Sequence, residues 1–283
     1  KQFLSSCSLP LPDFAEVTSE HQLHQVISRL GLPLICKTAR SGYDGKGQWL
    51  IREPSDIQRF ERILATSSTR VRWIAEQFVS FVRELSVLVV RSASGETRVY
   101  PVVENRHEQG ILRDSVVPAS ISPSDDEAAC ELAVRAVAEL HGVGIFCIEL
   151  FQAQDGRLLI NEIAPRPHNS GHYTLDACTV SQFEQQVRVM CGLPLGEVRL
   201  LSPAVMVNLL GDEVTTVLSG ERSRGTFSIP GAAVHLYGKR VIRQGRKMGH
   251  VTFTAPEREA AVASAQQFLS QVRKPPSAIP FHQ

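Results

Sequence analysis

The sequence predicts an α/β chain, and three observations support this fold class. Its 283 residues are enough for one large domain or for two to three smaller ones. Several segments carry apolar residues at helical spacing, and the apolar runs between them are of strand length. From Leu201 onward the pattern changes to short strands with frequent glycine. We therefore expect a domain boundary near residues 195–202.

Composition excludes two broad classes of function. Thirty Lys and Arg against 29 Asp and Glu leave a net charge of +1, whereas non-specific nucleic-acid binding requires a basic face. No apolar run approaches the ~18 residues of a membrane span. The six cysteines are scattered without a C-x-x-C pair, which favours reduced, buried thiols in the cytoplasm. The chain starts at Lys1 without a leader, so we expect a further segment ahead of it.

The first half of the chain predicts two helices among short strands. Helical spacing indicates a helix over residues 17–30, which Thr18 or Ser19 caps and Gly31 ends. Ser94-Gly95 predicts a turn between two later strands. The expected helices are 17–30 and 54–64, and the expected strands are 34–37, 49–51, 73–78, 84–91 and 99–103.

The second half predicts longer helices around a strand pair. Ser124 as the cap, Glu127 at the capping-box position and Gly142 beyond the end predict a helix over residues 124–141. Strands are expected at 145–153 and 157–163, before a long polar loop at 165–174. Further helices are expected at 176–191 and at about 257–272.

The strand pair brings two carboxylates together. Asp155-Gly156 indicates a two-residue hairpin turn, because a type I′ turn needs positive φ at both positions. If Gln154 pairs with Arg157, Glu149 lies directly opposite Glu162. Such carboxylates repel unless they share a proton or bind a divalent cation, and oxygen ligands favour Mg²⁺ over Zn²⁺. A solvated Glu at the strand end is the alternative.

Three further segments are candidates for binding. Glycines in residues 42–48 allow backbone N–H groups to surround a phosphate beside Lys37, although the spacing matches neither common phosphate-loop motif and a flexible hairpin is the alternative. The run 161–172 contains an Arg and two His, for which buried neutral histidines are the alternative. In the basic run 239–250, Gly245 would form a turn that brings Lys239 and Arg246 together on a phosphate, with an exposed hairpin as the alternative.

These motifs occur in one order that resembles a known family. They comprise Lys37 and residues 42–48, 76–77, 83–86, 105–107, 110–112, 161–172, 181–184 and 246–250. Together they resemble the 5-(carboxyamino)imidazole ribonucleotide synthases, ATP-grasp enzymes of purine biosynthesis. The resemblance covers nearly the whole chain.

The resemblance implies a fold and a reaction. It implies an ATP-grasp domain over residues 1–197, with a small lid subdomain at about 17–76 and a larger mixed and antiparallel sheet, and a small β-rich domain over residues 198–283. It implies that ATP and Mg²⁺ convert bicarbonate to carboxyphosphate, whose carbon reaches the amine of 5-aminoimidazole ribonucleotide. It also implies a cytoplasmic homodimer and a nucleotide-fold domain ahead of the ATP-grasp region.

The family motifs imply roles for individual residues. The implied catalytic residues are Lys37, Arg166 and His168, and the implied metal ligands are Glu149 and Glu162. The implied ATP contacts are Lys37, Gly42, Tyr43, Asp44, Gly45, Lys46, Gly47, Gln48, Glu76, Gln77, Phe78, Val79, Glu84, His107, Asn161 and Glu162. The implied contacts to the ribonucleotide and bicarbonate are Tyr43, Lys46, Arg166, His168, Asn169, Lys239 and Arg246.

Two other functions remain open at this point. A formate-using relative that makes formylglycinamide ribonucleotide has the same architecture, but the loop from His168 to His172 is not expected in it. The second alternative is a non-catalytic ATP-grasp module that binds only a nucleotide or a partner. The presence of Lys37, Glu149 and Glu162 argues against it, because a decayed site would have lost at least one of these residues.

Overall fold

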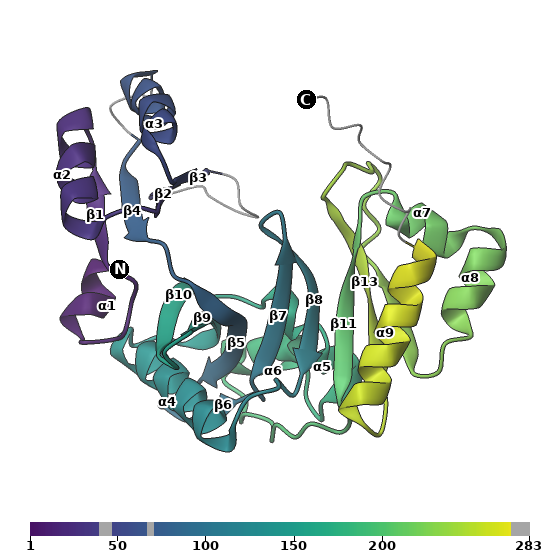
Figure 1. Ribbon diagram of the computed structural model, residues 1–283. Helices are drawn as coiled ribbons and strands as arrows, with labels where there is room; N and C mark the ends of the chain where they lie inside the picture. Colours follow the sequence, from purple (N-terminus) through teal and green to yellow (C-terminus); the bar gives the residue numbers. More distant parts are fainter. Residues whose placement is uncertain (40–46, 67–70, 273–283) are drawn as a thin grey trace. The chain divides into compact units, whose positions relative to one another are not determined.

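The computed structural model describes residues 1–39, 47–66 and 71–272 (Figure 1). It divides into two compact units. The first unit contains Lys1–Glu84, Glu108–Ile111 and Ile148–Ile163. The second contains Leu85–His107, Leu112–Cys147 and Ala164–Gln283. Helices and antiparallel strands mix in both, as the fold class predicts. The division at 197/198 stays a prediction.

A small antiparallel sheet organises the first unit. Its strand order is β1-β4-β2-β3, and the short helix α1 (Gln2–Ser6) precedes it. Helices α2 and α3 contribute Leu23 and Phe60 to one core cluster with Cys36 and Trp73 of the sheet. Phe60 and Trp73 meet edge to face at 5.1 Å, a favourable aromatic geometry. The bounds are β1 Phe14–Val17, α2 Glu20–Leu30, β2 Leu34–Thr38, β3 Gln48–Ile51, α3 Pro54–Thr66 and β4 Trp73–Gln77.

The first predicted helix starts later than expected. Residues of β1 pair with β4, with Phe14 opposite Glu76 and Val17 opposite Trp73, so they cannot join the helix. Ser19 is the cap, and its side chain accepts a hydrogen bond from the backbone N–H of Gln22 at 3.3 Å.

The larger sheet has nine strands, in the order β10-β9-β5-β7-β8-β11-β13-β12 with β6 beside β5. The hairpin of β7 and β8 was not expected. Its turn residues Gln109 and Gly110 both have positive φ, which a type I′ turn requires. Strand β11 pairs with β8, so strands after residue 198 continue this sheet. The bounds are β5 Phe81–Arg91, β6 Thr97–Val99, β7 Val103–Glu108, β8 Ile111–Val117, β9 Gly144–Ala153, β10 Leu158–Ala164, β11 Ala204–Leu210, β12 Ala232–Leu236 and β13 Lys247–Thr254.

The second unit also holds helices that the sequence analysis did not place. Helices α7 and α8 follow β11, whereas α9 packs on β11 and β13 as Phe268 meets Phe253 at 5.3 Å (Figure 1). The cap of α4 is Ser122 rather than Ser124, because proline is favoured at the first helical position and Pro123 occupies it. The bounds are α4 Pro123–Glu139, η1 Asn169–Gly171, α5 Thr174–Ala177, α6 Gln182–Met190, α7 Glu213–Leu218, α8 Gly220–Phe227 and α9 Arg258–Val272.

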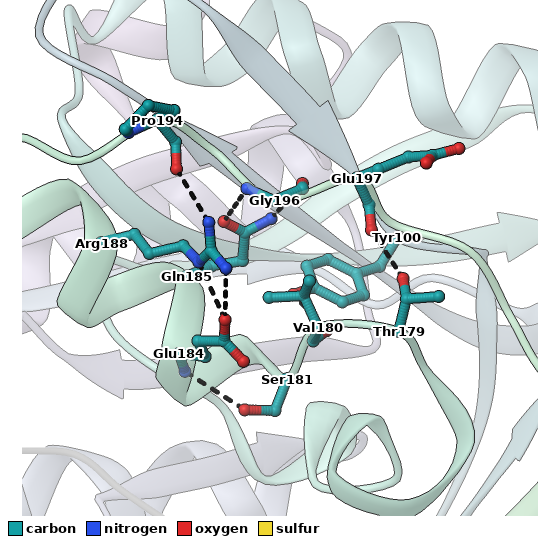
Figure 2. Close-up of polar contacts among 10 residues, drawn as sticks. All are labelled: Tyr100, Thr179, Val180, Ser181, Glu184, Gln185, Arg188, Pro194, Gly196 and Glu197. Atoms are coloured by element: carbon teal, nitrogen blue, oxygen red, sulfur yellow. Dashed lines mark hydrogen bonds and ion pairs between the residues drawn. The ribbon is translucent and has the colours of Figure 1, made fainter.

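The helix expected over residues 176–191 is two helices, α5 and α6. Between them Cys178 forms a bridge with Leu200, and the Tyr100 hydroxyl donates to the carbonyl of Val180 at 3.0 Å. These contacts take backbone groups that a continuous helix would need. Figure 2 shows how Gln185 of α6 then holds the backbone of Gly196 through both ends of its amide.

The cysteines are free thiols. Cys36, Cys147 and Cys178 are buried, Cys7 and Cys130 are half-buried and Cys191 is exposed, so the expectation of burial fails for Cys191. Among the described residues, none of the helices has the length and apolar character to cross a membrane.

Candidate active site

Lys37 lies at the centre of a charged cluster in the first unit. Its Nζ is 2.9 Å from Glu76 Oε2 and 3.2 Å from Asn161 Oδ1. In the β2–β4 register Ile35 is opposite Glu76 and Lys37 is opposite Ile74, so Lys37 and Glu76 are diagonal neighbours on one face. The Glu76 side chain is only 5% exposed. The strand pairing therefore holds a charged hydrogen bond away from bulk water.

A second ammonium joins this cluster. Lys1 Nζ lies 3.4 Å from Glu76 Oε1 and 3.4 Å from the carbonyl of Ile160. Burial lowers the pKa of the Lys1 side chain, and the attraction of Glu76 opposes that shift. One carboxylate thus contacts two ammonium groups at this place.

At the end of β4 the backbone N–H groups already have hydrogen-bond partners within the protein. The backbone N–H groups of Gln77 and Phe78 donate to Asp13 and Pro33, whereas both side chains are exposed. Val79 and Glu84 are half-buried. Beyond them Phe81 stacks on Phe151 at 4.7 Å, with 6° between the rings. The nucleotide roles of residues 76–79 and of Glu84 stay predictions.

The hairpin of β9 and β10 differs from the expected one. The N–H of Ala153 donates to the carbonyl of Arg157 at 2.9 Å, and the N–H of Gly156 donates to the carbonyl of Ala153 at 3.0 Å. This pattern is a three-residue loop in which Gly156 adopts φ +84° and forms a bulge. The expected pairing of Gln154 with Arg157 is therefore wrong.

The new register changes the argument for a carboxylate pair. Ala153 pairs with Arg157 at the turn, so the numbers of paired residues add to 310. If this register continues along the two strands, Asn161 rather than Glu162 lies opposite Glu149. Glu149 is half-buried and Glu162 is exposed. The assignment of both carboxylates as metal ligands stays a prediction.

In the second unit, the loop after β10 forms a short 3₁₀ turn that His168 caps. His168 Nδ1 accepts a hydrogen bond from the backbone N–H of Ser170 at 3.3 Å and lies 2.9 Å from the Ser170 hydroxyl. Gly171 is required here, because a Cβ would lie 2.4 Å from Leu88 Cδ1 and 2.7 Å from Gln182 Oε1.

A buried glutamine that the sequence analysis did not assign a role fixes this loop. Gln182 Oε1 accepts from the N–H of His168, and Gln182 Nε2 donates to the carbonyl of His168, both at 2.8 Å. The same Nε2 lies 2.9 Å from His172 Nδ1. Gln182 is fully buried. It lies in the motif 181–184 that resembles the family, but nothing in the sequence assigns its side chain a role, since a glutamine has no special meaning at this position by itself.

Two neighbouring candidates have partners within the second unit. Asn169 and Asn208 exchange amide hydrogen bonds of 2.9 and 2.7 Å. Arg166 is exposed, and its guanidinium donates to the carbonyl of Pro167 at 3.0 Å. His107, at the end of β7, is half-buried. Substrate roles for these residues stay predictions.

Three histidines gather beside the C-terminal strands. His235 Nε2 lies 3.0 and 3.1 Å from the two carboxylate oxygens of Asp176, and its ring stacks on His250 at 4.5 Å with 12° between the planes. Burial lowers the pKa of His250 to about 3 and that of His172 to about 4. A neighbouring histidine contributes to each shift, after burial.

This group does not fit a metal centre. Ligand atoms of Asp176, His235 and His250 lie within 4.8 Å of one another. Nitrogen lone pairs lie in the plane of an imidazole, so two nearly parallel stacked rings do not direct them at one tetrahedral centre. A hydrogen bond between His235 and Asp176 beside a buried neutral imidazole describes the geometry better.

The basic run forms the expected turn. The N–H of Arg246 donates to the carbonyl of Arg243 at 3.0 Å, and Gly245 adopts φ +72°. Arg246 donates to the carbonyl of Val241 at 2.7 Å, whereas Lys239 Nζ lies 2.5 Å from the carbonyl of Lys247. A shared phosphate site for Lys239 and Arg246 stays a prediction. Of the glycine-rich loop, Gly47 and Gln48 are described, whereas Gly42, Tyr43, Asp44, Gly45 and Lys46 lie outside the described residues.

Known proteins match this chain along most of its length. Residues 2–183 match the ATP-grasp domain, and residues 204–264 match the phosphoribosylaminoimidazole carboxylase C-terminal domain. The N5-carboxyaminoimidazole ribonucleotide synthase of Bacillus subtilis is 45% identical over 253 residues, which are 89% of this chain and 64% of that relative. The chain thus spans less than two thirds of this relative.

Solved structures agree with this fold. A crystal structure of an ADP complex of N5-carboxyaminoimidazole ribonucleotide synthetase has a TM-score of 0.87 and 41% identity, and the match covers 96% of this chain and 71% of that one. The synthase of Aspergillus clavatus, solved with ADP and 5-aminoimidazole ribonucleotide, has a TM-score of 0.85 and 32% identity over 96% of this chain and 70% of that one. The fold is therefore the ATP-grasp fold, and the chain belongs to the N5-carboxyaminoimidazole ribonucleotide synthase family of ATP-grasp proteins.

Proposed function

We propose that this chain carries out the ATP-dependent carboxylation of 5-aminoimidazole ribonucleotide with bicarbonate. The observation that carries the proposal is the contact of Lys37 Nζ with Glu76 and Asn161. It brings together residues from three of the motifs that resemble the family. The Aspergillus clavatus relative, solved with ADP and the ribonucleotide, supports the same substrates.

The proposed reaction has two steps. A bicarbonate oxygen attacks the γ-phosphorus of ATP, and the bond to the β-phosphate oxygen breaks to give ADP and carboxyphosphate. The amine nitrogen of the ribonucleotide then bonds to the carboxyl carbon, phosphate leaves with the electrons of the C–O bond, and the nitrogen loses a proton. Lys37 would stabilise negative charge on the phosphoryl group.

Glu149, Glu162 and the neighbouring Asn161 would hold the Mg²⁺ that accompanies ATP. Their carboxylate and amide oxygens are the donors that Mg²⁺ prefers. At the turn Ala153 pairs with Arg157. A β-bulge in β10 beyond the turn would let Asn161 and Glu162 share the position opposite Glu149. A bound Mg²⁺ supplies positive charge against the phosphate oxygens.

Lys239 and Arg246 would bind the 5′-phosphate of the ribonucleotide, with Arg166, His168 and Asn169 near the bicarbonate. A guanidinium offers two parallel N–H donors to phosphate oxygens, and an ammonium adds a point charge. With a net charge of only +1, local cations must hold this anion.

The test is ADP release with bicarbonate, measured with and without the ribonucleotide, together with detection of the carboxylated product. We expect release that depends on the ribonucleotide. Release that instead depends on formate and glycinamide ribonucleotide would indicate the formate-using alternative. Nucleotide binding without any ADP release would indicate a non-catalytic module.

We further propose a homodimer in the cytoplasm. Phe183, Val187 and Met190 follow one face of α6 and are 37%, 56% and 75% exposed. An exposed apolar stripe of this kind is typical of a protein interface. Sizing by light scattering should give twice the chain mass, and Met190→Glu should shift the protein to the monomer. A wild-type monomer would contradict the proposal.

A further inference from the structure

A chain of hydrogen bonds links three strands of the larger sheet to the loop of His168. We call its four side chains, from β8, β7, β5 and η1, the buried polar chain. The Ser115 Oγ–Asn105 Oδ1 distance is 2.7 Å, the Asn105 Nδ2–Ser86 Oγ distance is 2.8 Å and the Ser86 Oγ–Ser170 Oγ distance is 2.9 Å. Ser170 Oγ then lies 2.9 Å from His168 Nδ1.

The buried polar chain lies where apolar side chains would be expected. Its four members are at most 8% exposed. Neighbouring positions on the same strands, Leu88 and Val103, belong to an apolar core cluster. A buried polar group loses its hydration and is stabilised only by a hydrogen-bond partner, so packing alone does not explain four of them in a row.

The hydrogen bonds of the chain all run in one direction. Ser115 donates its hydroxyl proton to the carbonyl of Asn105, and the Asn105 amide donates to Ser86. Ser86 donates its only proton to Ser170. The Ser170 hydroxyl then keeps its own proton, for which His168 Nδ1 at 2.9 Å is a nearer and stronger acceptor than Cys147 Sγ at 3.7 Å.

The backbone of Ser170 determines the protonation of the histidine. Its N–H lies 3.3 Å from His168 Nδ1, and a backbone N–H can only donate. Nδ1 must then carry a lone pair, so the proton of the neutral imidazole is on Nε2. In an imidazolium Nδ1 would carry a proton, and this N–H would point at the backbone N–H of Ser170, so two donors would face each other.

The backbone of His168 is held by a residue outside the buried polar chain. Gln182 holds both the N–H and the carbonyl of His168 at 2.8 Å. The hydroxyl and amide groups of Ser86 and Asn105 are linked to the histidine ring through Ser170. Ser86 and Asn105 therefore act on the imidazole ring of His168 rather than on its backbone.

We propose that Ser86, Asn105 and Ser115 are positioning residues that keep His168 neutral with its proton on Nε2. His168 then acts in the carboxylation as a hydrogen-bond donor from Nε2 to an oxygen of the bicarbonate-derived group, not as a general base. This role rests on the proposed function. The state of the ring does not, because it follows from contacts within the protein.

Nitrogen-detected NMR of ¹⁵N-histidine-labelled protein reads the ring directly. Comparison with His168→Gln assigns the His168 signals and separates them from those of His172. The neighbouring titratable groups are His172 and the Cys147 thiol, which lies 3.7 Å from Ser170 Oγ. In the wild type we expect a protonated Nε2 and an unprotonated Nδ1 at neutral pH. A protonated Nδ1 would overturn the proposal.

Asn105→Asp tests the direction of the chain. The aspartate has nearly the same shape but only accepts, so Ser86 turns its proton toward position 105 and Ser170 turns its proton toward Ser86. Nδ1 then faces an acceptor oxygen. We expect the titration midpoint of His168 to rise by about one pH unit or more. Ser86→Ala interrupts the chain and should give a smaller rise.

The matched control is Thr252→Val, which removes a buried hydroxyl from β13 outside the chain. It should leave the His168 signals unchanged. If both Asn105→Asp and Ser86→Ala also leave the midpoint unchanged, the proposal is wrong. Should Asn105→Asp fail to fold, the wild-type spectrum and Ser86→Ala decide.

Kinetics separate this inference from the proposed function. With active enzyme, Ser86→Ala should lower kcat by about tenfold or more, as loss of a supporting hydrogen bond does in other sites, and leave KM for ATP unchanged. The spectra need no substrate. A protein that shows the expected spectra but no carboxylation would contradict only the proposed function.

Discussion

Lys37 is a residue in which stability and proposed function depend on the same charge. Its ammonium neutralises a carboxylate, Glu76, whose side chain is 5% exposed, and the proposed reaction needs that ammonium on a phosphoryl group. Lys37→Met should lower kcat by about 100-fold or more, the size found for loss of a charge-stabilising donor. It should also lower Tm, because among the described residues Glu76 then keeps Lys1 as its one paired cation.

A second variant separates the two effects. Lys37→Met combined with Glu76→Gln removes both charges and leaves no buried carboxylate without its partner. Tm should return toward the wild-type value, whereas ADP formation should stay low. ADP formation that recovered together with Tm would mean that Lys37 is a structural lysine.

At the scale of an element, the hairpin of β9 and β10 carries the proposed metal ligands. Glu149→Gln and Glu162→Gln should each keep the fold and abolish ADP formation, because a neutral amide cannot offset the charge of Mg²⁺. The assay is ADP release over a range of Mg²⁺ concentrations. Asp155→Asn is the matched control, since Asp155 is an exposed carboxylate in the loop of the same hairpin. A Glu162→Gln enzyme with full activity at saturating Mg²⁺ would contradict the assignment.

The turn at Gly245 carries the proposed phosphate site. Arg246→Ala should raise the KM for the ribonucleotide by a factor that corresponds to about 1.5–3 kcal/mol, the range for a hydrogen bond to a charged group. The KM for ATP should hardly change. Arg243→Ala, an exposed arginine of the same turn, serves as the control. Equal effects of the two variants on the KM for the ribonucleotide would indicate general electrostatic attraction by the basic turn rather than a specific phosphate site at Arg246.

The hairpin also shows what an element's sequence leaves open. Asp155-Gly156 correctly predicts a hairpin, but the dipeptide is compatible with both a two-residue and a three-residue loop. The number of loop residues sets which side chains are opposite, and a shift of one residue moves a side chain to the other face. The carboxylate pairing therefore depended on a choice that the turn signal could not make.

At the scale of the whole molecule, buried imidazoles make stability depend on pH. Burial lowers the pKa of His250 to about 3 and that of His172 to about 4, whereas an unfolded histidine titrates near about 6.5. Between these values the unfolded chain binds more protons than the folded one, so the free energy of unfolding falls as pH drops below about 6.5. Above that pH the contribution is fully present.

Urea unfolding measured at pH values across this window tests the linkage. His250→Gln should flatten the dependence of the unfolding free energy on pH. His21→Gln, at an exposed position on α2, should keep the wild-type slope. A wild-type curve without any slope below about pH 6.5 would contradict burial of neutral imidazoles.

The sequence by itself determined the local elements and the family. Helix caps, glycines at the ends of elements and the spacing of apolar residues predict most helices and strands, because each signal depends on residues that are near one another in the chain. Ordered motifs such as Lys37 and the run 161–172 were sufficient for the family, which the matched domains confirm.

Only the tertiary structure decided which groups meet. The pairing of Lys37 with Glu76, the amide clamp of Gln182 on His168 and the buried polar chain from Ser115 to Ser170 join positions that are distant in sequence. A lone serine or glutamine has the same local preference whether it is solvated or buried. Strand order and register alone determine where its donor and acceptor point, and the protonation of His168 follows from that arrangement.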